Sequence, residues 1–255
     1  MTIKSKWDLA MIVRAIGLGL GLAILAATAA GAEPGLSEQV YGAVVDEGRK
    51  EVELRYGRLN GGAGDGQSAL LGEVSYGVND WWYTAGLAQF ESQPGGDLKL
   101  ADIGWENLLE LTGSHEDLLR TAVYAEIKVS TIGGEPGELE FKGIAEYRPA
   151  PWNFRFNLIF ERQFGDNAND QTEFGYAIRA VRDVGDKIRV GVEGFGDLGT
   201  FEHVGGALPN YWGPIIAGEV PIDRGEIELQ AGFLVGFGDN AGDNQIRLSA
   251  EWDFF

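Results

Sequence analysis

The fold is decided by the stretch Leu119-Arg120-Thr121-Ala122-Val123-Tyr124-Ala125-Glu126-Ile127-Lys128-Val129-Ser130. One parity carries Leu119, Val123, Ala125, Ile127 and Val129, and the other carries Arg120, Tyr124, Glu126, Lys128 and Ser130. A period of two residues is typical of an extended strand whose side chains alternate between two faces. The stretch therefore predicts a β-strand that separates an apolar surface from a charged one.

The same alternation recurs along the chain. It is clear at residues 138–148, 152–161, 173–180, 188–193, 226–235 and 246–254, and weaker at 51–59, 69–78, 81–90, 102–111 and 210–220. Each segment approaches the ~9–11 residues that a tilted strand needs to cross a membrane. We therefore predict an all-β fold, a transmembrane antiparallel up-and-down β-barrel of about twelve strands, with 10 or 14 as the alternatives.

The links between these segments alternate in length. Short links occur at 79–80, 148–151, 184–186 and 221–224, and longer glycine-rich links at 61–68, 91–99, 131–137, 165–172, 199–209 and 238–244. Bacterial outer-membrane barrels pair short periplasmic turns with longer outer loops. An even strand count would place both chain ends in the periplasm.

Aromatic residues gather beside the short links, as in the interfacial girdle of a membrane barrel. The predicted girdle contains Tyr76, Trp81, Tyr83, Tyr147, Trp152, Trp252 and Phe254. An aromatic-rich soluble core is the alternative interpretation. Three places fit the barrel badly: Asn107 has the apolar parity, Pro214 lies inside a strand, and the parity around Trp81-Trp82-Tyr83 is ambiguous, so that its face assignment could be inverted.

The N-terminus has the order of a secretory signal peptide. Lys4, Lys6 and Arg14 precede an apolar stretch at 15–30, and Ala30-Gly31-Ala32 offers a cleavage site. A signal anchor is the alternative, but the uncharged stretch is shorter than the ~20 residues of a spanning helix. We predict a signal peptide at 1–32, a periplasmic N-terminal lead-in at 33–50 and the barrel at 51–255. The lead-in is too short for a globular plug but could fold partly into the lumen.

The charge and the absence of cysteine exclude several protein classes. Loss of residues 1–32 would leave 223 residues with a net charge of −21, because it removes three basic residues and one acidic residue. Such a surface repels nucleic acid. The chain has no cysteine, so neither a disulfide nor a thiolate metal site is available.

Two stretches resemble known proteins. The final strand, 245–255, resembles the aromatic-ended last strand by which outer-membrane barrels are recognised for assembly, although Phe255 has the opposite parity from Phe254. Gly48-Arg49-Lys50-Glu51-Val52-Glu53-Leu54, with the barrel pattern that follows, resembles the broad family of outer-membrane transporters named for phenol-degradation pathways. That resemblance implies export or uptake of small solutes.

No sequence motif predicts an enzyme. The segment 194–199 has the glycine spacing of a dinucleotide-binding loop, but no helix follows it. His115 and His203 lie in predicted links without a convincing triad, and loops 165–170 and 238–244 are oxygen-rich, which turn chemistry also explains. We expect no catalytic residue, cofactor or dedicated metal site.

The strongest functional feature is the set of charges that share the inward parity. The proposed pore-lining residues are Glu126, Lys128, Glu140, Lys142, Glu146, Arg155, Glu161, Arg179, Arg189, Glu193, Glu226 and Glu228. In a water-filled lumen their acidic excess would favour cations, whereas in a dry lumen they would be interlocked ion pairs.

These features favour a narrow passive channel for small hydrophilic or weakly amphipathic solutes in the outer membrane of a Gram-negative bacterium. The alternatives are a non-conducting structural or adhesive surface barrel, an outer-membrane lipid-modifying enzyme and a secreted soluble β protein. The expected partners are outer-membrane lipid and lipopolysaccharide, the barrel assembly machinery through the C-terminal strand, and small solutes.

Overall fold

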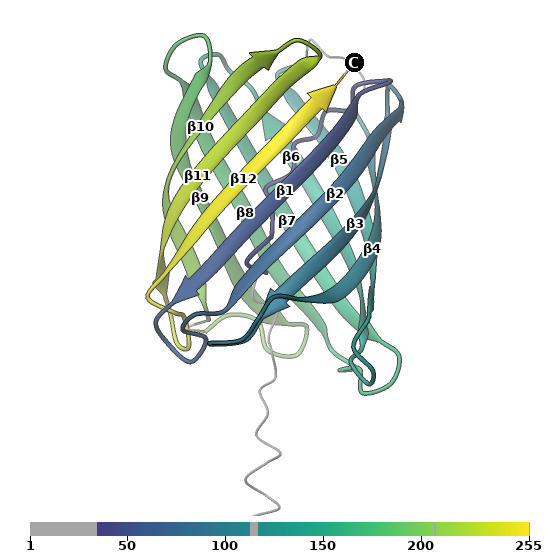
Figure 1. Cartoon of the computed structure of the whole chain (residues 1–255), viewed down its shortest axis with the longest axis vertical. Coiled ribbons are helices and arrows are strands. Elements are labelled where there is room, and N and C mark those ends of the chain that lie inside the picture. The colour runs from purple at the N-terminus through teal and green to yellow at the C-terminus, as the bar shows by residue number, and fades with distance from the viewer. Residues whose placement is uncertain (1–34, 113–116, 207, 255) are drawn as a thin grey trace, which may run out of the picture. The chain divides into compact units, whose positions relative to one another are not determined.

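The computed structural model describes residues 35–112, 117–206 and 208–254. Its strands are β1 (Lys50–Asn60), β2 (Ser68–Asn79), β3 (Trp82–Ser92), β4 (Lys99–Glu110), β5 (Leu119–Ser130), β6 (Gly137–Tyr147), β7 (Trp152–Phe164), β8 (Thr172–Asp183), β9 (Ile188–Thr200), β10 (Asn210–Ile222), β11 (Gly225–Phe237) and β12 (Asn244–Phe254). Each strand pairs with its chain neighbours, and β1 pairs with β12, so the sheet closes (Figure 1). The predicted all-β up-and-down barrel is confirmed. In the described part of the chain, no helix is long and apolar enough to cross a membrane.

The alternation read from the sequence becomes two surfaces of the closed sheet. On β5, Val123 and Val129 point outward and are 40% and 49% exposed, whereas Tyr124 between them points inward and is 2% exposed. The outward face carries large apolar side chains on all twelve strands. A closed sheet satisfies every backbone donor and acceptor by strand pairing, which leaves no free edge.

The two ends of the barrel differ in their connections. At one end, here called the short-turn end, Asp80-Trp81, residues 148–151, 184–187 and Asp223-Arg224 join strands. The other end, the long-loop end, carries the glycine-rich links. Tyr76, Trp81, Tyr147, Trp152 and Trp252 surround the short-turn end and are 41–49% exposed. Tyr83 does not belong to this girdle, because its hydroxyl group points inward and donates to Glu73.

The structure explains the two strand positions that fitted badly. Asn107 points outward, but its side-chain oxygen accepts a hydrogen bond from Trp82 Nε1 at 3.0 Å, so this polar atom has a partner on the outer face. The β10–β11 pairing is interrupted at Gly213 and Pro214, between the pairs Trp212↔Val235 and Ile215↔Gly232, with the register unchanged. The missing proline N–H therefore falls at a local opening of the ladder.

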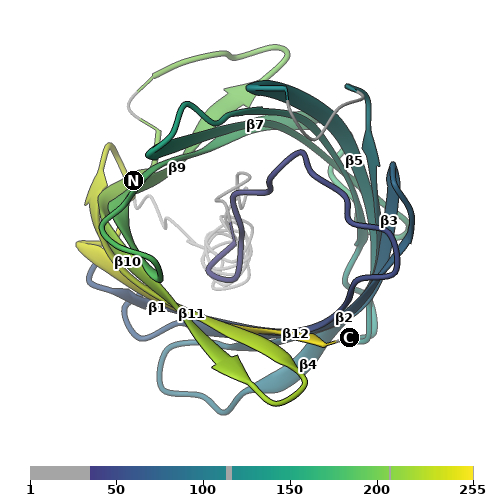
Figure 2. The same ribbon diagram turned by 90° about the horizontal axis from the view of Figure 1, so that it is seen from above.

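Residues 35–49, here called the N-terminal segment, run inside the ring of strands and lead into β1 at the short-turn end (Figures 1 and 2). Glycines let the segment approach the wall. A Cβ atom on Gly57 would lie 1.9 Å from the carbonyl oxygen of Leu36, and one on Gly77 would lie 2.0 Å from that of Asp46. The predicted lead-in at 33–50 thus contacts the barrel interior over its described residues. Residues 1–34, including the predicted signal peptide, lie outside the described part.

Candidate functional site: the barrel interior

The N-terminal segment divides the charged interior of the barrel into two regions. All twelve predicted pore-lining residues point inward. A cavity on one side of the segment is lined by Glu146, Arg155, Arg179, Arg189, Glu193, Glu226 and Glu228. The other five, Glu126, Lys128, Glu140, Lys142 and Glu161, lie on β5, β6 and β7 outside this cavity lining.

The backbone of the segment is held by side chains of the wall. Asn157 on β7 accepts from the Tyr41 amide at 2.7 Å and donates to the Tyr41 carbonyl at 3.0 Å. The Ala43 amide donates to Glu146 at 2.9 Å, and the Val45 amide donates to Glu110 at 3.1 Å. These bonds satisfy backbone groups that closure of the barrel removes from water, as a neighbouring strand would.

Tyr41 anchors the segment against the wall. Its ring packs on Tyr124 at 4.6 Å between centroids, and the ammonium group of Lys142 lies 4.6 Å and 4.8 Å from the two ring centroids. Tyr41 Oη donates to Glu106 at 3.0 Å. Burial, followed by the charge of Glu106, raises the pKa of Tyr41 well above its usual value. The phenol therefore stays protonated and remains a donor.

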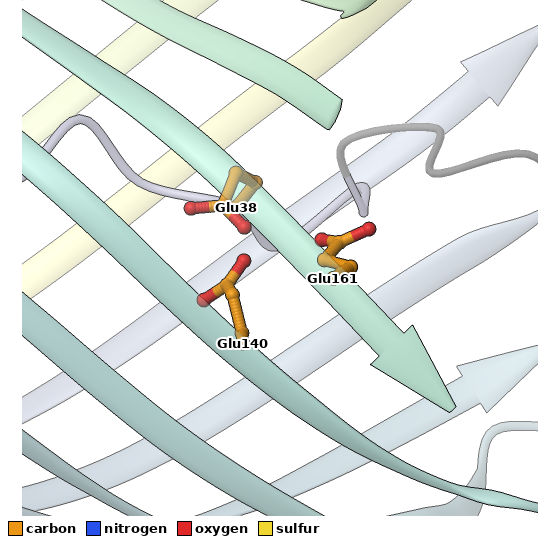
Figure 3. Close-up of side chains that lie close together, drawn as sticks. All are labelled: Glu38, Glu140 and Glu161. Carbon is orange, nitrogen blue, oxygen red and sulfur yellow. The ribbon is translucent and has the colours of Figure 1, made fainter. Parts of the chain in front are cut away.

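A carboxylate cluster lies where the segment meets β6 and β7. Glu38, Glu140 and Glu161 bring oxygen atoms within 4.8 Å of one another (Figure 3). Lys142 Nζ contacts Glu38 at 2.5 Å and Glu140 at 3.1 Å. Burial acts to raise the pKa of Glu38, but the charge and hydrogen bond of Lys142 outweigh it, so the pKa is lowered. Glu38 is thus an ionised partner of Lys142 at neutral pH.

Apolar contacts seal the segment at two depths. Val40 and Leu36 pack against a cluster formed with Leu59, Ile159, Ala177, Phe195, Tyr211 and Leu234 on the inner wall. Nearer the short-turn end, Tyr41, Ala43 and Val45 pack against Leu108, Ala122, Tyr124 and Ile144. The two clusters therefore hold the segment against the inner wall of the barrel.

A cavity of about 340 Å³ lies beside the segment. Arg155, Arg179 and Arg189 line it from the consecutive strands β7, β8 and β9. Its other lining residues include a group of carboxylates on β1, β10, β11 and β12: Glu51, Glu53, Glu219, Glu226, Glu228, Glu251 and Asp253. Charges of opposite sign on different strands create a transverse field across such a space.

Several of these charges are paired. Arg189 contacts Glu228 at 2.5 Å and Glu219 at 3.1 Å. Arg49, at the base of the segment, contacts Glu251 and Asp253 on β12, each at 2.5 Å. The pKa of Arg49 is raised, because these carboxylates and Glu51 outweigh the effect of its burial.

Several interior residues escaped prediction from the sequence. Glu51, Glu53, Arg55, Glu73 and Glu106 point inward from β1, β2 and β4, and Glu38, Tyr41 and Arg49 belong to the segment. The alternation of Glu51, Glu53 and Arg55 with Val52, Leu54 and Tyr56 was a usable signal. No periodic signal marks Glu38 or Tyr41, because the segment is not a strand.

The other candidate motifs take ordinary structural roles. Residues 194–199 continue strand β9, as expected for a glycine spacing with no following helix. His203 is exposed in a loop, where its amide bonds to Thr200, and His115 lies outside the described residues. Asn167 and Asn240 adopt positive φ angles of 62° and 65°, so the two oxygen-rich loops use asparagine for turn geometry.

Solved structures similar to this fold include an outer-membrane channel and two porins. An outer-membrane channel from Pseudomonas putida F1 has a TM-score of 0.61 and 9% identity, covering 82% of this chain and 97% of that one. The NanC porin has a TM-score of 0.56 and 10% identity, covering 79% and 98%. The KdgM porin has a TM-score of 0.51 and 7% identity, covering 80% and 99%. At these identities the likeness shows the fold alone. No protein-family model matches the sequence, and neither does any curated protein.

Proposed function

We propose that the chain is an outer-membrane channel that passes small hydrophilic or weakly amphipathic solutes passively through a charged lumen. The observation that carries this proposal is the 340 Å³ cavity, lined by charges of both signs inside a closed twelve-strand barrel. The fold shared with the Pseudomonas putida F1 channel and two porins supports the same function.

The outer-membrane location rests on the outward face. Leu54, Val74, Phe141, Ile216 and Leu229 are 49–61% exposed on strands around the barrel, a distribution that lipid covers and water does not. Export would use the signal peptide at 1–32, and lipid and lipopolysaccharide would surround the mature barrel. Strand β12, with its aromatic end, would engage the barrel assembly machinery. The resemblance to transporters named for phenol-degradation pathways supports small solutes as the cargo.

In this proposal the N-terminal segment obstructs part of the channel. It packs into both apolar clusters inside the barrel, and its displacement would widen the path. The acidic excess of the lumen would then favour cations over anions. The second candidate function is a non-conducting structural or adhesive barrel, which the same segment and the paired charges favour.

Single-channel recording separates these two functions. The mature protein, purified in detergent and inserted into planar bilayers under a salt gradient, should give discrete cation-preferring steps. Replacing Glu226 and Glu228 together by Gln should reduce the cation preference, and Glu202→Gln, in an exposed loop, is the matched control. A folded barrel that stays silent, both as the native chain and with the segment displaced by Gly57→Ala, would support the structural function instead.

A further inference from the structure

We propose that the cavity holds a binding site for small zwitterionic solutes of the α-amino-acid class, with the carboxylate on Arg155 and Arg179 and the ammonium group near Glu226 and Glu228. This inference rests on the proposed channel function and names its solute. The volume of about 340 Å³ lies within the range of small-molecule sites, about 300–1,000 Å³.

The first observation is that Arg179 lacks a close acceptor. Its side chain is only 11% exposed, yet Nε has no hydrogen-bond partner in the described part of the chain. The nearest carboxylate oxygens are Glu193 Oε1 at 3.7 Å and Glu228 Oε1 at 3.9 Å. Arg–carboxylate hydrogen bonds are ordinarily ~2.7–2.9 Å long, so neither oxygen satisfies the guanidinium group.

Both carboxylates near Arg179 are already bound to other donors. Glu193 Oε1 accepts from Gln230 Nε2 at 3.0 Å. Glu228 Oε2 lies 2.5 Å from Arg189 NH2. Because those contacts are shorter, the two carboxylates are held away from Arg179. Arg179 lines the cavity, and its buried Nε has no acceptor in the described part of the chain.

The second observation is that the sheet places another guanidinium group beside Arg179. Arg155 on β7 is the register partner of Arg179 on β8, so both side chains leave the same face of the sheet at adjacent positions. Like charges at directly opposed positions are destabilising. Arg155 reaches Glu146 through Nε at 3.2 Å and remains 28% exposed. An anion between the two guanidinium groups relieves their repulsion, and a carboxylate matches their paired donors.

The third observation is the acidic group next to this pair. Glu226 and Glu228 lie on the same face of β11, two residues apart, which is roughly 7 Å along a strand. Glu226 lines the cavity, and its side chain has no hydrogen bond or ion pair to another described residue. A ligand ammonium group bound at Glu226 and Glu228 would lie close to a ligand carboxylate bound at Arg179, because Glu228 Oε1 is 3.9 Å from Arg179 NH2. A zwitterion is therefore complementary to both halves, whereas a simple anion meets the carboxylates unpaired.

Calorimetry on the mature, folded barrel in detergent tests the site without requiring conductance. The probes are L-glutamine as a zwitterion, acetate as an anion and ethylammonium as a cation. We expect L-glutamine to bind more tightly than either single-charge probe. Arg179→Gln should weaken L-glutamine binding by about tenfold or more, since it removes a charged donor. Arg162→Gln, on the exposed outer side of β7, is the matched control and should bind normally.

Two further variants separate the halves of the site. Glu226→Gln should weaken L-glutamine binding but leave acetate binding equal or tighter. Arg179→Lys keeps the charge but loses the planar fork, so its affinity should fall between those of the native chain and Arg179→Gln. A heat-modifiability assay checks that each variant is folded.

The outcomes distinguish this proposal from the channel function. L-glutamine binding without conductance would retain the site and overturn the channel. Discrete conductance with no L-glutamine binding, or with binding unchanged by Arg179→Gln, would overturn the site and retain the channel. Acetate binding as tightly as L-glutamine would show a general anion site and overturn the zwitterion assignment.

Discussion

One added methyl group on β1 should release the N-terminal segment. The Cβ of Gly57→Ala would lie 1.9 Å from the carbonyl oxygen of Leu36, whereas carbon–oxygen contacts are ordinarily at least ~3.3 Å. The segment must therefore retreat by about 1.4 Å, because the wall strand is fixed on both sides by β2 and β12. That movement also strains the contacts of Arg247 with the carbonyl groups of Gly35 and Glu38.

The expected magnitude follows from the cost of overpacking. A forced extra methyl group typically costs about 1–3 kcal/mol. Since ~1.4 kcal/mol corresponds to a tenfold change in an equilibrium constant, the undocked population should rise roughly 5- to 150-fold. The strand itself should tolerate alanine, because Gly57 has no positive φ angle and alanine is an ordinary residue in a barrel wall.

The assay uses the absence of cysteine from the native chain. Ser37→Cys places a near-isosteric thiol on the segment at a position that is 4% exposed. Its maleimide labelling rate should rise by the same factor in the Gly57→Ala background, and bilayer conductance should rise with it. Gly86→Ala is the matched control, because its Cβ would meet nothing within 4 Å. Equal labelling in all three backgrounds would refute the docking described here.

Three other perturbations test the same interior. Asn157→Ala leaves the buried backbone amide and carbonyl of Tyr41 unpaired, at a cost of about 1–3 kcal/mol each. Thiol labelling of Ser37→Cys should therefore rise more in this background than in the Gly57→Ala background. In the native chain the pKa of Glu38 is lowered, so its ionised contact with Lys142 is fully formed above pH ~4.5 and is lost as the pH falls through the lowered pKa. In Lys142→Met the effect of burial dominates, so carboxyl-carbon NMR should show the pKa of Glu38 above its ordinary value. Docking of the segment in this variant should then be favoured by low pH. Arg49→Gln removes the contacts to Glu251 and Asp253 on β12. The loss of about 1 kcal/mol after solvent screening should lower the thermal unfolding midpoint by a few degrees. An unchanged midpoint would show that these ion pairs do not stabilise the barrel.

The faces of strand β3, which the sequence left ambiguous at its start, are set by a local cause. Trp81-Trp82-Tyr83 is apolar on both parities, so alternation gives no phase there. The turn sets the phase instead: Asn79 Oδ1 accepts from the amides of Trp81 and Trp82, and the β2–β3 register shifts between Gly77 and Asn79. Tyr83 consequently points into the barrel. A side-chain cap of this kind depends on geometry that the hydrophobic pattern does not record.

The sequence by itself determined the barrel and the inward direction of the charges, and it predicted about twelve strands with 10 or 14 as alternatives. A period of two residues is a local property of the sequence. In every strand that has apolar residues at alternate positions, these side chains lie on one face, and the strands of one sheet turn that face to the same surroundings. The alternation of short and long links indicated that successive strands run in opposite directions between the two ends of the barrel.

Only the tertiary structure decided what the inward charges contact. Glu140 and Lys142 face the N-terminal segment, whereas Arg179 and Glu228 face a cavity, although all four share one parity pattern. The difference arises because Tyr41 and Glu38 reach β5, β6 and β7 across the closed ring, from positions about a hundred residues earlier in the chain. Contacts across a lumen depend on closure of the whole sheet, and no local repeat in the sequence encodes them.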